Sequence, residues 1–147
     1  MNQNELWRSF ITEKPEYAGK EYEAWSFGGD PDLLAGLAAA GIKTATASAY
    51  PLYALEGEPL PRAGDVSVIQ DGKENALCII ETEKVSVVPF REVSARHAWM
   101  EGEGDRSLEY WRKVHEAFFK EEMSAAGLEF TEDMDVVCEE FRVIYAE

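Results

Sequence analysis

Gly41-Ile42-Lys43-Thr44-Ala45-Thr46-Ala47-Ser48 is the stretch around which this chain is organised. A helix is predicted to end at the glycine, and a short strand is predicted to follow it. Side chains alternate along an extended chain, so the hydroxyls at 44, 46 and 48 should share one face and the alanines the other. A lysine among small residues and hydroxyls is a candidate reactive or anion-binding group. The alternative is an exposed lysine beside a threonine-rich strand.

The bulk composition favours a single globular domain. The chain has 147 residues, of which 46% are hydrophobic and 29% charged, so residues 1–147 are expected to form one soluble domain with a full core. No apolar run approaches the roughly 20 residues that span a bilayer, and no secretory signal is visible. Cys78 and Cys138 lie in apolar runs and are predicted to be buried and reduced. We therefore expect a cytoplasmic protein without a membrane partner.

The charge balance restricts the possible partners. A formal net charge of -15 argues against sequence-independent binding of nucleic acid, which needs a positive face to displace counterions. No duplex DNA partner is expected. A nucleoside-sized ligand fits the acidic balance better than a long phosphate tract does.

The first third of the chain predicts two helices separated by an aromatic segment. Apolar residues at helical spacing over 4–13 predict the first helix. Asp30 is the expected N-cap of the second, and its expected buried stripe comprises Leu33, Leu34, Leu37 and Ala38. The aromatic residues between them fit either an edge strand or a ligand-facing loop, and either core packing or base stacking: Tyr22, Trp25 and Phe27.

The remaining chain alternates strands and helices without repeats. A helical turn is expected over 50–55, and Asp71-Gly72 predicts a hairpin between a strand from Asp65 and a return strand over 76–88, with a bulge near Glu81. Serines at 94 and 107 are expected to cap two further helices, the second ending around 127, and the last strand covers 134–145. This order favours an α+β domain with a small, largely antiparallel sheet or barrel.

A flexible acidic loop, Glu101-Gly102-Glu103-Gly104-Asp105, is expected after the first of these capped helices. Glu101, Glu103 and Asp105 can bind a hard cation, or they can be solvated charges that complement the next helix N-terminus. His97 and His115 are expected on a helix surface or in the core, because no pair of histidines and cysteines has zinc-ligand spacing. We expect neither a metal nor a cofactor.

Lys43, Thr46 and the acidic segment form a candidate catalytic set. A threonine hydroxyl is a poor nucleophile unless a base takes its proton, and a desolvated lysine can be that base. A nearby carboxylate can hold the lysine or carry a proton to a leaving nitrogen. Positions 43 and 46 face opposite sides of a regular strand, so the pair works only if the chain turns at Lys43.

Gly41-x-Lys43-x-x-Thr46 resembles the motif of the ASCH-domain family, which is related to PUA domains. Ser48 stands where the family motif has arginine, which weakens any inference about phosphate binding. The resemblance extends over most of the chain through further segments: Trp25-x-Phe27-Gly28, Gly57-Glu58-x-x-Pro61-x-x-Gly64-Asp65, His97-Ala98-x-x-Glu101-Gly102-Glu103-Gly104-Asp105, Tyr110-Trp111 and Cys138-Glu139-x-Phe141.

The resemblance implies a fold and two classes of function. It implies a PUA-like small β-barrel of mixed and antiparallel strands with peripheral helices, and a cleft suited to RNA or a nucleoside. One family branch contains amidohydrolases that act on N-acetylcytidine with a lysine, a threonine and a glutamate, which fall here on Lys43, Thr46 and Glu101. Other members resemble ribonucleases or RNA-binding modules.

Two hypotheses follow from the resemblance. The first is a hydrolase of an acylated nucleoside, in which Thr46 attacks, Lys43 accepts the proton and Glu101 assists the departing amine. The second is a module that binds single-stranded RNA in the same cleft, with or without ribonuclease activity. The expected substrate-binding residues in either case are Trp25, Phe27, Thr44 and Ser48.

Overall fold

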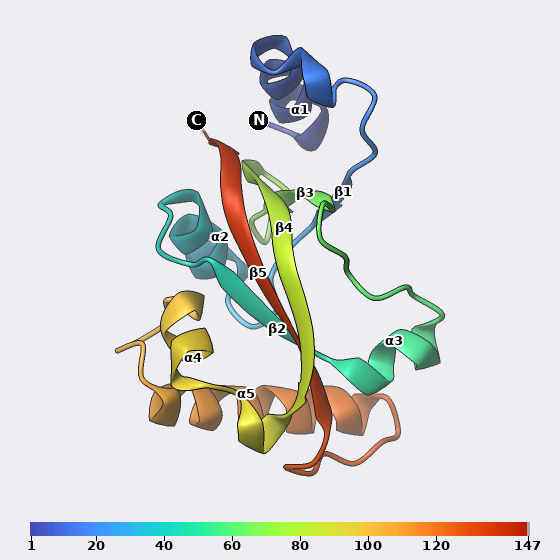
Figure 1. The fold of residues 1–147 in the computed structure, drawn as a ribbon, viewed down its shortest axis with the longest axis vertical. Coiled ribbons are helices and arrows are strands. Elements are labelled where there is room, and N and C mark those ends of the chain that lie inside the picture. The colour runs from blue at the N-terminus through green and yellow to red at the C-terminus, as the bar shows by residue number, and fades with distance from the viewer. Residues whose placement is uncertain (147) are drawn as a thin grey trace.

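The computed structural model describes residues 1–146 and is built on a five-stranded mixed sheet (Figure 1). Its strand order is β1-β3-β4-β5-β2, with β1 parallel to β3 and the other neighbours antiparallel. The strands are β1 (Glu23–Trp25), β2 (Ala45–Ala49), β3 (Val66–Gln70), β4 (Ala76–Pro89) and β5 (Asp135–Ala146). The short strand β1 forms one edge of the sheet, which is one of the two alternatives expected for the aromatic segment.

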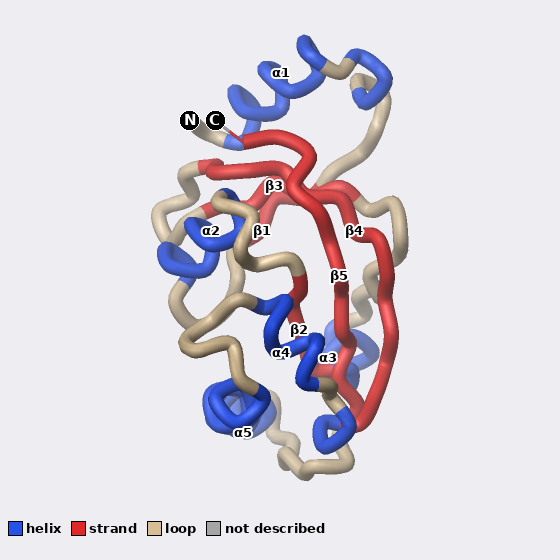
Figure 2. Tube along the Cα trace, turned by 60° about the vertical axis from the view of Figure 1, so that its left-hand side comes forward, coloured by secondary structure: helices blue, strands red, loops and turns tan. Residues whose placement is uncertain are grey.

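The two longest strands bend the sheet. The antiparallel ladder of β4 and β5 shifts register between Ile79 and Ile80 and again between Thr82 and Lys84. Such irregularities increase local twist. The sheet therefore curls into a half-barrel, which the tube view shows plainly (Figure 2). Glu81, near which a bulge was predicted, pairs in regular register and lies between these two shifts. The predicted α+β, PUA-like class is confirmed.

Five α-helices surround the sheet in the described residues 1–146. They are α1 (Gln3–Glu13), α2 (Pro31–Ala39), α3 (Tyr50–Glu56), α4 (Ala95–Glu101) and α5 (Leu108–Ala125), with short 3-10 turns at Pro15–Tyr17 and Phe90–Glu92. The predicted N-caps are present: side chains at 30, 94 and 107 accept backbone hydrogen bonds from the first turns of α2, α4 and α5. None of the helices within 1–146 has the length and apolar character to cross a membrane.

Three buried clusters hold the helices against the sheet. One joins α5 to β2 and β5, one joins α2 to the middle strands, and one joins α1 to β3 and β4. Helices α1 and α5 therefore lie at opposite ends of the molecule (Figure 1). Cys78 and Cys138 are buried and free, as predicted.

The predicted buried stripe of α2 was wrong at one position. Leu33 is 55% exposed, whereas Ala35 is fully buried beside Leu34 and Ala38. The small alanines allow this helix to lie close to the sheet, so the buried face is centred one position away from that expected from leucine spacing. A second difference concerns Glu101, which is the last residue of α4 rather than part of a loop.

Candidate functional site

A cavity of about 1270 Å³ lies between the sheet and the surrounding helices and loops. Its lining includes most of the residues predicted from the sequence: Trp25, Phe27, Lys43, Thr46, Ser48 and Glu101. Thr44 does not line it, because its hydroxyl lies 3.4 Å from the Met100 carbonyl oxygen and its amide donates to the same oxygen. The predicted catalytic residues thus share one cavity, and one predicted binding residue lies outside it.

The chain turns before β2, which places Lys43 and Thr46 on the same cavity. Gly41 adopts φ +78°, a left-handed conformation that favours glycine at the end of a helix. The amides of Ile42 and Lys43 then both donate to the Leu37 carbonyl, at 2.9 and 3.1 Å. Regular strand structure begins only at residue 45, so Lys43 is free of strand alternation. The turn that the sequence required is present.

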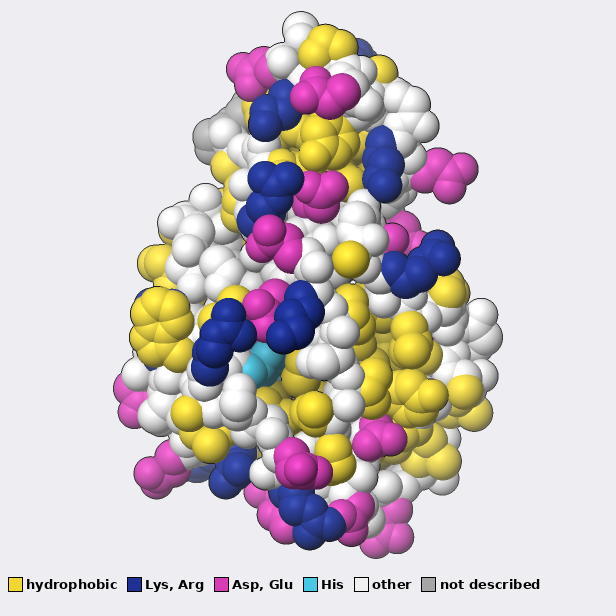
Figure 3. All heavy atoms as spheres, in the orientation of Figure 1, with side chains coloured by type: hydrophobic (Ala, Val, Ile, Leu, Met, Phe, Trp, Pro, Cys, Tyr) yellow, Lys and Arg dark blue, Asp and Glu magenta, His cyan; other side chains and the backbone are white. Residues whose placement is uncertain are grey.

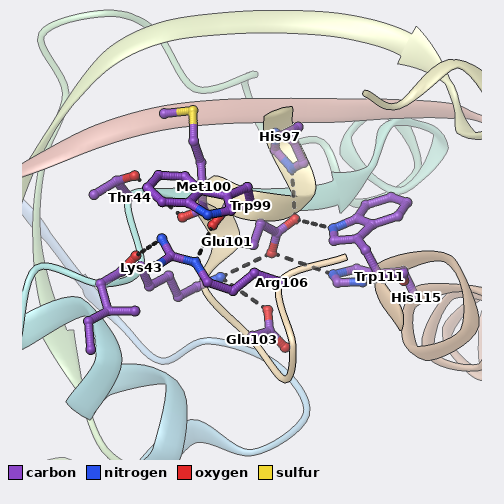
Figure 4. Close-up of polar contacts among 11 residues, drawn as sticks. Lys43, Thr44, His97, Trp99, Met100, Glu101, Glu103, Arg106, Trp111 and His115 are labelled. Carbon is purple, nitrogen blue, oxygen red and sulfur yellow. Dashed lines mark hydrogen bonds and ion pairs between the residues drawn. The ribbon is translucent and has the colours of Figure 1, made fainter. Parts of the chain in front are cut away.

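Glu101 is the centre of the polar cluster and is only 1% exposed. Its Oε1 atom accepts a hydrogen bond from Lys43 Nζ at 3.0 Å and lies 3.5 Å from His115 Nε2. Its Oε2 atom lies 2.7 Å from His97 Nε2 and accepts from the Trp111 indole at 2.6 Å. Figure 4 shows these four side chains around one carboxylate; they come from the segment before β2, from α4 and from α5. Such complete pairing is what makes a buried charge tolerable.

Glu103 is the second carboxylate on the lysine. Its Oε2 atom lies 3.3 Å from Lys43 Nζ, and its side chain is 14% exposed. The alternative of a fully solvated acidic segment was therefore wrong for Glu101 and Glu103. Asp105 is exposed and accepts from the Ser107 amide, as expected of a charge beside a helix N-terminus.

Gly102 makes the turn that aims both carboxylates at Lys43. It has φ +75°, and a Cβ atom there would lie 2.8 Å from the Ile42 carbonyl oxygen. Any other residue would strain this backbone and displace the segment preceding Lys43. The glycine thus lets the end of α4 pack directly against the chain that carries the lysine.

The electrostatic balance differs between the two carboxyl groups. Burial acts to raise the pKa of Glu101, but the Lys43 ammonium and hydrogen bonds from His115 and His97 outweigh it and hold that pKa well below its usual range. Burial and the Glu101 charge raise the pKa of Glu103 above its ordinary value, although Lys43 opposes them. Burial acts to lower the pKa of His115, yet the hydrogen bond to Glu101 and the charges of both carboxylates raise it.

The two histidines are functional candidates that the sequence interpretation missed. Both are buried against Glu101, although neither was assigned a role beyond helix surface or core. A signal was present: His97 and Glu101 are four apart on one helix, and so are Trp111 and His115. The rings of Trp111 and His115 stack at 4.2 Å, which fixes the orientation of both donors.

Aromatic side chains form another part of the wall. Phe27 is 4% exposed, and its ring centroid lies 5.0 Å from Lys43 Nζ. The half-buried Trp25 contacts this ring edge-on, with 5.0 Å between the ring centroids. Tyr22 instead stacks on Trp7, with 4.3 Å between the centroids. The hydroxyl oxygens of Ser48 and Tyr53 are hydrogen-bonded at 2.7 Å. Phe27 therefore packs in the core and also lines the cavity.

A metal ion would need to compete with the lysine. Ligand atoms of Glu101, Glu103 and His115 lie within 4.8 Å of one another, a spacing compatible with a cation. Both carboxylates already bond the Lys43 ammonium, so an ion would have to displace it. The arrangement is suited to proton transfer at least as well as to metal binding.

The curled mixed sheet and its surrounding helices define a PUA-like α+β domain. The family model for the ASCH domain matches residues 23–145. The chain belongs to the ASCH-domain family.

Solved structures agree with this assignment. A crystal structure of an ASCH domain from Lactobacillus crispatus JV V101 is 32% identical, with a TM-score of 0.90 over 97% of this chain and 93% of that one. Protein EF3133 from Enterococcus faecalis V583 is 37% identical, with a TM-score of 0.86 over 99% and 94%. Hypothetical protein PH0355, 20% identical with a TM-score of 0.55 over 84% and 98%, shares the fold alone. A search of curated proteins found no match.

Proposed function

We propose that this ASCH-domain protein is a hydrolase that removes an acyl group from the amine of a modified nucleoside such as N-acetylcytidine. The observation that carries the proposal is the buried Lys43–Glu101–Glu103 cluster on a cavity that Thr46 also lines. A threonine hydroxyl needs a base to act as a nucleophile, and a buried lysine that lines the same cavity can be that base once a carboxylate has taken its proton.

The first half of the reaction forms an acyl-threonine. Lys43 passes a proton to Glu103, whose raised pKa makes it the better acceptor of the two carboxylates. The neutral amine then accepts the Thr46 proton as Oγ1 bonds the acyl carbon. The carbon–nitrogen bond breaks, and the leaving nitrogen takes the proton back from Lys43.

The second half releases the acyl group. Water attacks the acyl-threonine, Lys43 accepts its proton, and this proton returns to the departing Thr46 oxygen. Glu101 has a low pKa and four partners, so we assign it the positioning of Lys43 and the compensation of its charge. This differs from the proton-transfer role that the family resemblance gave it.

Aromatic residues and charge support a nucleoside as the substrate. The half-buried Trp25 offers a ring surface on which a base can stack, and the buried Phe27 packs beside it in the cavity wall. The net charge is -15, and the face shown in Figure 3 has basic side chains interspersed with acidic ones rather than a continuous basic track. A continuous basic track would strengthen binding of a nucleic-acid backbone. Its absence from this face makes a neutral nucleoside the better candidate ligand.

One observation favours RNA binding as a second candidate. The cavity volume of about 1270 Å³ exceeds the range of roughly 300–1,000 Å³ that is usual for small-molecule sites, and Lys20 and Arg62 are among its lining residues. A single strand with one base inserted would fit this description. Binding of that kind must weaken steeply as salt rises.

The test is incubation of the pure protein with N-acetylcytidine and, separately, with total RNA. We expect acetate and cytidine in the first reaction, intact RNA in the second, and nucleoside binding that is insensitive to salt. Salt-dependent RNA binding without release of acetate would overturn the hydrolase and support the binding module.

A further inference from the structure

A second buried carboxyl group, which makes no bond to the lysine cluster, lines the same cavity. Glu139 lies on β5 directly opposite Thr46 on β2, so the two side chains emerge on the same face of the sheet. Both line the cavity. The mechanism above makes no use of Glu139.

The contacts of Glu139 leave one of its oxygens available. The side chain is 8% exposed, and its Oε2 atom accepts from the Thr82 hydroxyl at 3.3 Å. Within residues 1–146 every fully buried side-chain oxygen has a hydrogen-bond partner, and Oε1 of Glu139 has none. The Oε1 atom is therefore accessible from the cavity.

Among residues 1–146, no lysine, arginine or histidine forms an ion pair with Glu139, whose side-chain partner is Thr82. The cross-strand partners of Glu139, Thr46 on β2 and Val85 on β4, do not titrate. Burial raises the pKa of Glu139 to about 7; the Thr82 hydrogen bond opposes this and the charge of Asp65 adds to it. Burial and the charge of Glu139 raise the pKa of Tyr53 on α3, although the hydrogen bond with Ser48 opposes them. A carboxyl group of this kind holds a proton much more readily than Glu101 does.

We propose that Glu139 is a specificity-determining residue, whose carboxyl group donates a hydrogen bond to an acceptor atom of the substrate's heterocyclic base. Because Oε2 accepts from Thr82, the donor is Oε1–H, the atom open to the cavity. Its natural partner is an unprotonated ring nitrogen, as in a cytosine-type base. A uracil-type base carries an N–H at that position and presents a second donor instead.

The position of Glu139 also orients the reacting group. In a cytosine ring, the carbon that carries the amine adjoins the acceptor nitrogen. A base held at Glu139 therefore directs its acylated amine towards the neighbouring strand β2, which carries Thr46. This inference rests on the proposed function to the extent that it takes the ligand to be a nucleoside.

The test compares Glu139→Gln, Glu139→Leu and a matched control, Glu140→Gln. Glutamine keeps an N–H donor at every pH, leucine has none, and Glu140 pairs with Arg96 and does not line the cavity. The probes are cytidine and uridine, titrated by calorimetry at pH 6 and pH 8.5. N-acetylcytidine hydrolysis is measured alongside to separate kcat from KM.

We expect the natural protein and Glu140→Gln to prefer cytidine and to bind it roughly tenfold or more weakly at the higher pH, as the donor is lost. Glu139→Gln should bind equally at both pH values, and Glu139→Leu should bind weakly at both. A Glu139→Gln variant with the same pH slope as the natural protein overturns the inference. So does a loss of kcat with unchanged KM and binding.

The outcomes distinguish this inference from the proposed function. Hydrolysis with cytidine binding unaffected by Glu139→Gln removes the inference and keeps the hydrolase. Binding of cytidine that depends on Glu139 and pH, without hydrolysis, keeps the inference and removes the hydrolase. Absence of cytidine binding at both pH values, together with absence of hydrolysis, overturns both.

Discussion

At the scale of single residues, Lys43 takes part in each proton transfer of the proposed reaction, and its charge is buried. It is 1% exposed and bonds two carboxylates, one of which is itself 1% exposed. The sequence interpretation proposed Lys43, Thr46 and Glu101 from two short segments that resemble family motifs, each of them local in the chain. It treated the acidic segment as flexible, because the partners of Glu101 lie on two helices whose packing no local pattern specifies.

Replacing Lys43 tests its role as a base. We expect Lys43→Arg to lose activity by roughly 100-fold or more, because guanidinium stays protonated. Lys43→Met should be equally inactive and also less stable by about 3–5 kcal/mol, since it leaves Glu101 buried without its charge partner. Hydrolysis rates and denaturant melts of both variants give the answer. Full activity in Lys43→Arg would mean that only positive charge is needed.

Glu139 makes stability depend on pH in a direction that can be measured. Its folded-state pKa is raised to about 7, so its stabilising contribution is complete below about pH 4.5 and is lost as pH rises through 7. Glu139→Gln removes this loss and should be more stable than the natural protein at pH 8 by about 1–3 kcal/mol. Urea unfolding at pH 5 and pH 8 tests this. An equal difference at both pH values contradicts it.

At the scale of elements, caps and breakers were the reliable sequence signals. The capping residues of α2, α4 and α5 were predicted because each acts within its own turn. The curvature of the sheet was predictable only in part: a bulge was expected near Glu81, but the register shifts between β4 and β5 depend on how distant residues pair. Leu33 was misplaced because spacing gives a face of the helix but not its rotation against the sheet.

The turn between α4 and the acidic segment can be tested with two glycines that have the same φ angle. Gly102 and Gly127 both have φ +75°, but only Gly102 would place a Cβ against the Ile42 backbone. Both alanine variants should lose about 1 kcal/mol from backbone strain. Gly102→Ala should lose more, and its activity should fall at least tenfold, because the carboxylates move relative to Lys43. Similar activities in the two variants would argue against this role of the turn.

At the scale of the whole molecule, the half-barrel brings a turn before β2, the end of α4 and one face of α5 to a single cavity. Composition and charge had indicated a small-ligand site rather than a polymer surface. They gave no sign of the second carboxyl on β5, because its position opposite Thr46 follows from strand pairing alone.

Replacing the Thr46 hydroxyl with a methyl group tests most directly the central claim that Thr46 is the nucleophile of a hydrolase. Thr46→Val removes the proposed nucleophile at nearly constant volume, and Thr44→Val makes the same change two residues away, outside the cavity. The measurement is the rate of acetate release from N-acetylcytidine, together with the mass of the intact protein during turnover. We expect Thr44→Val to match the natural protein, and Thr46→Val to lose activity by roughly 100-fold or more and to form no acyl-protein. Release of acetate by Thr46→Val at the natural rate would contradict the account.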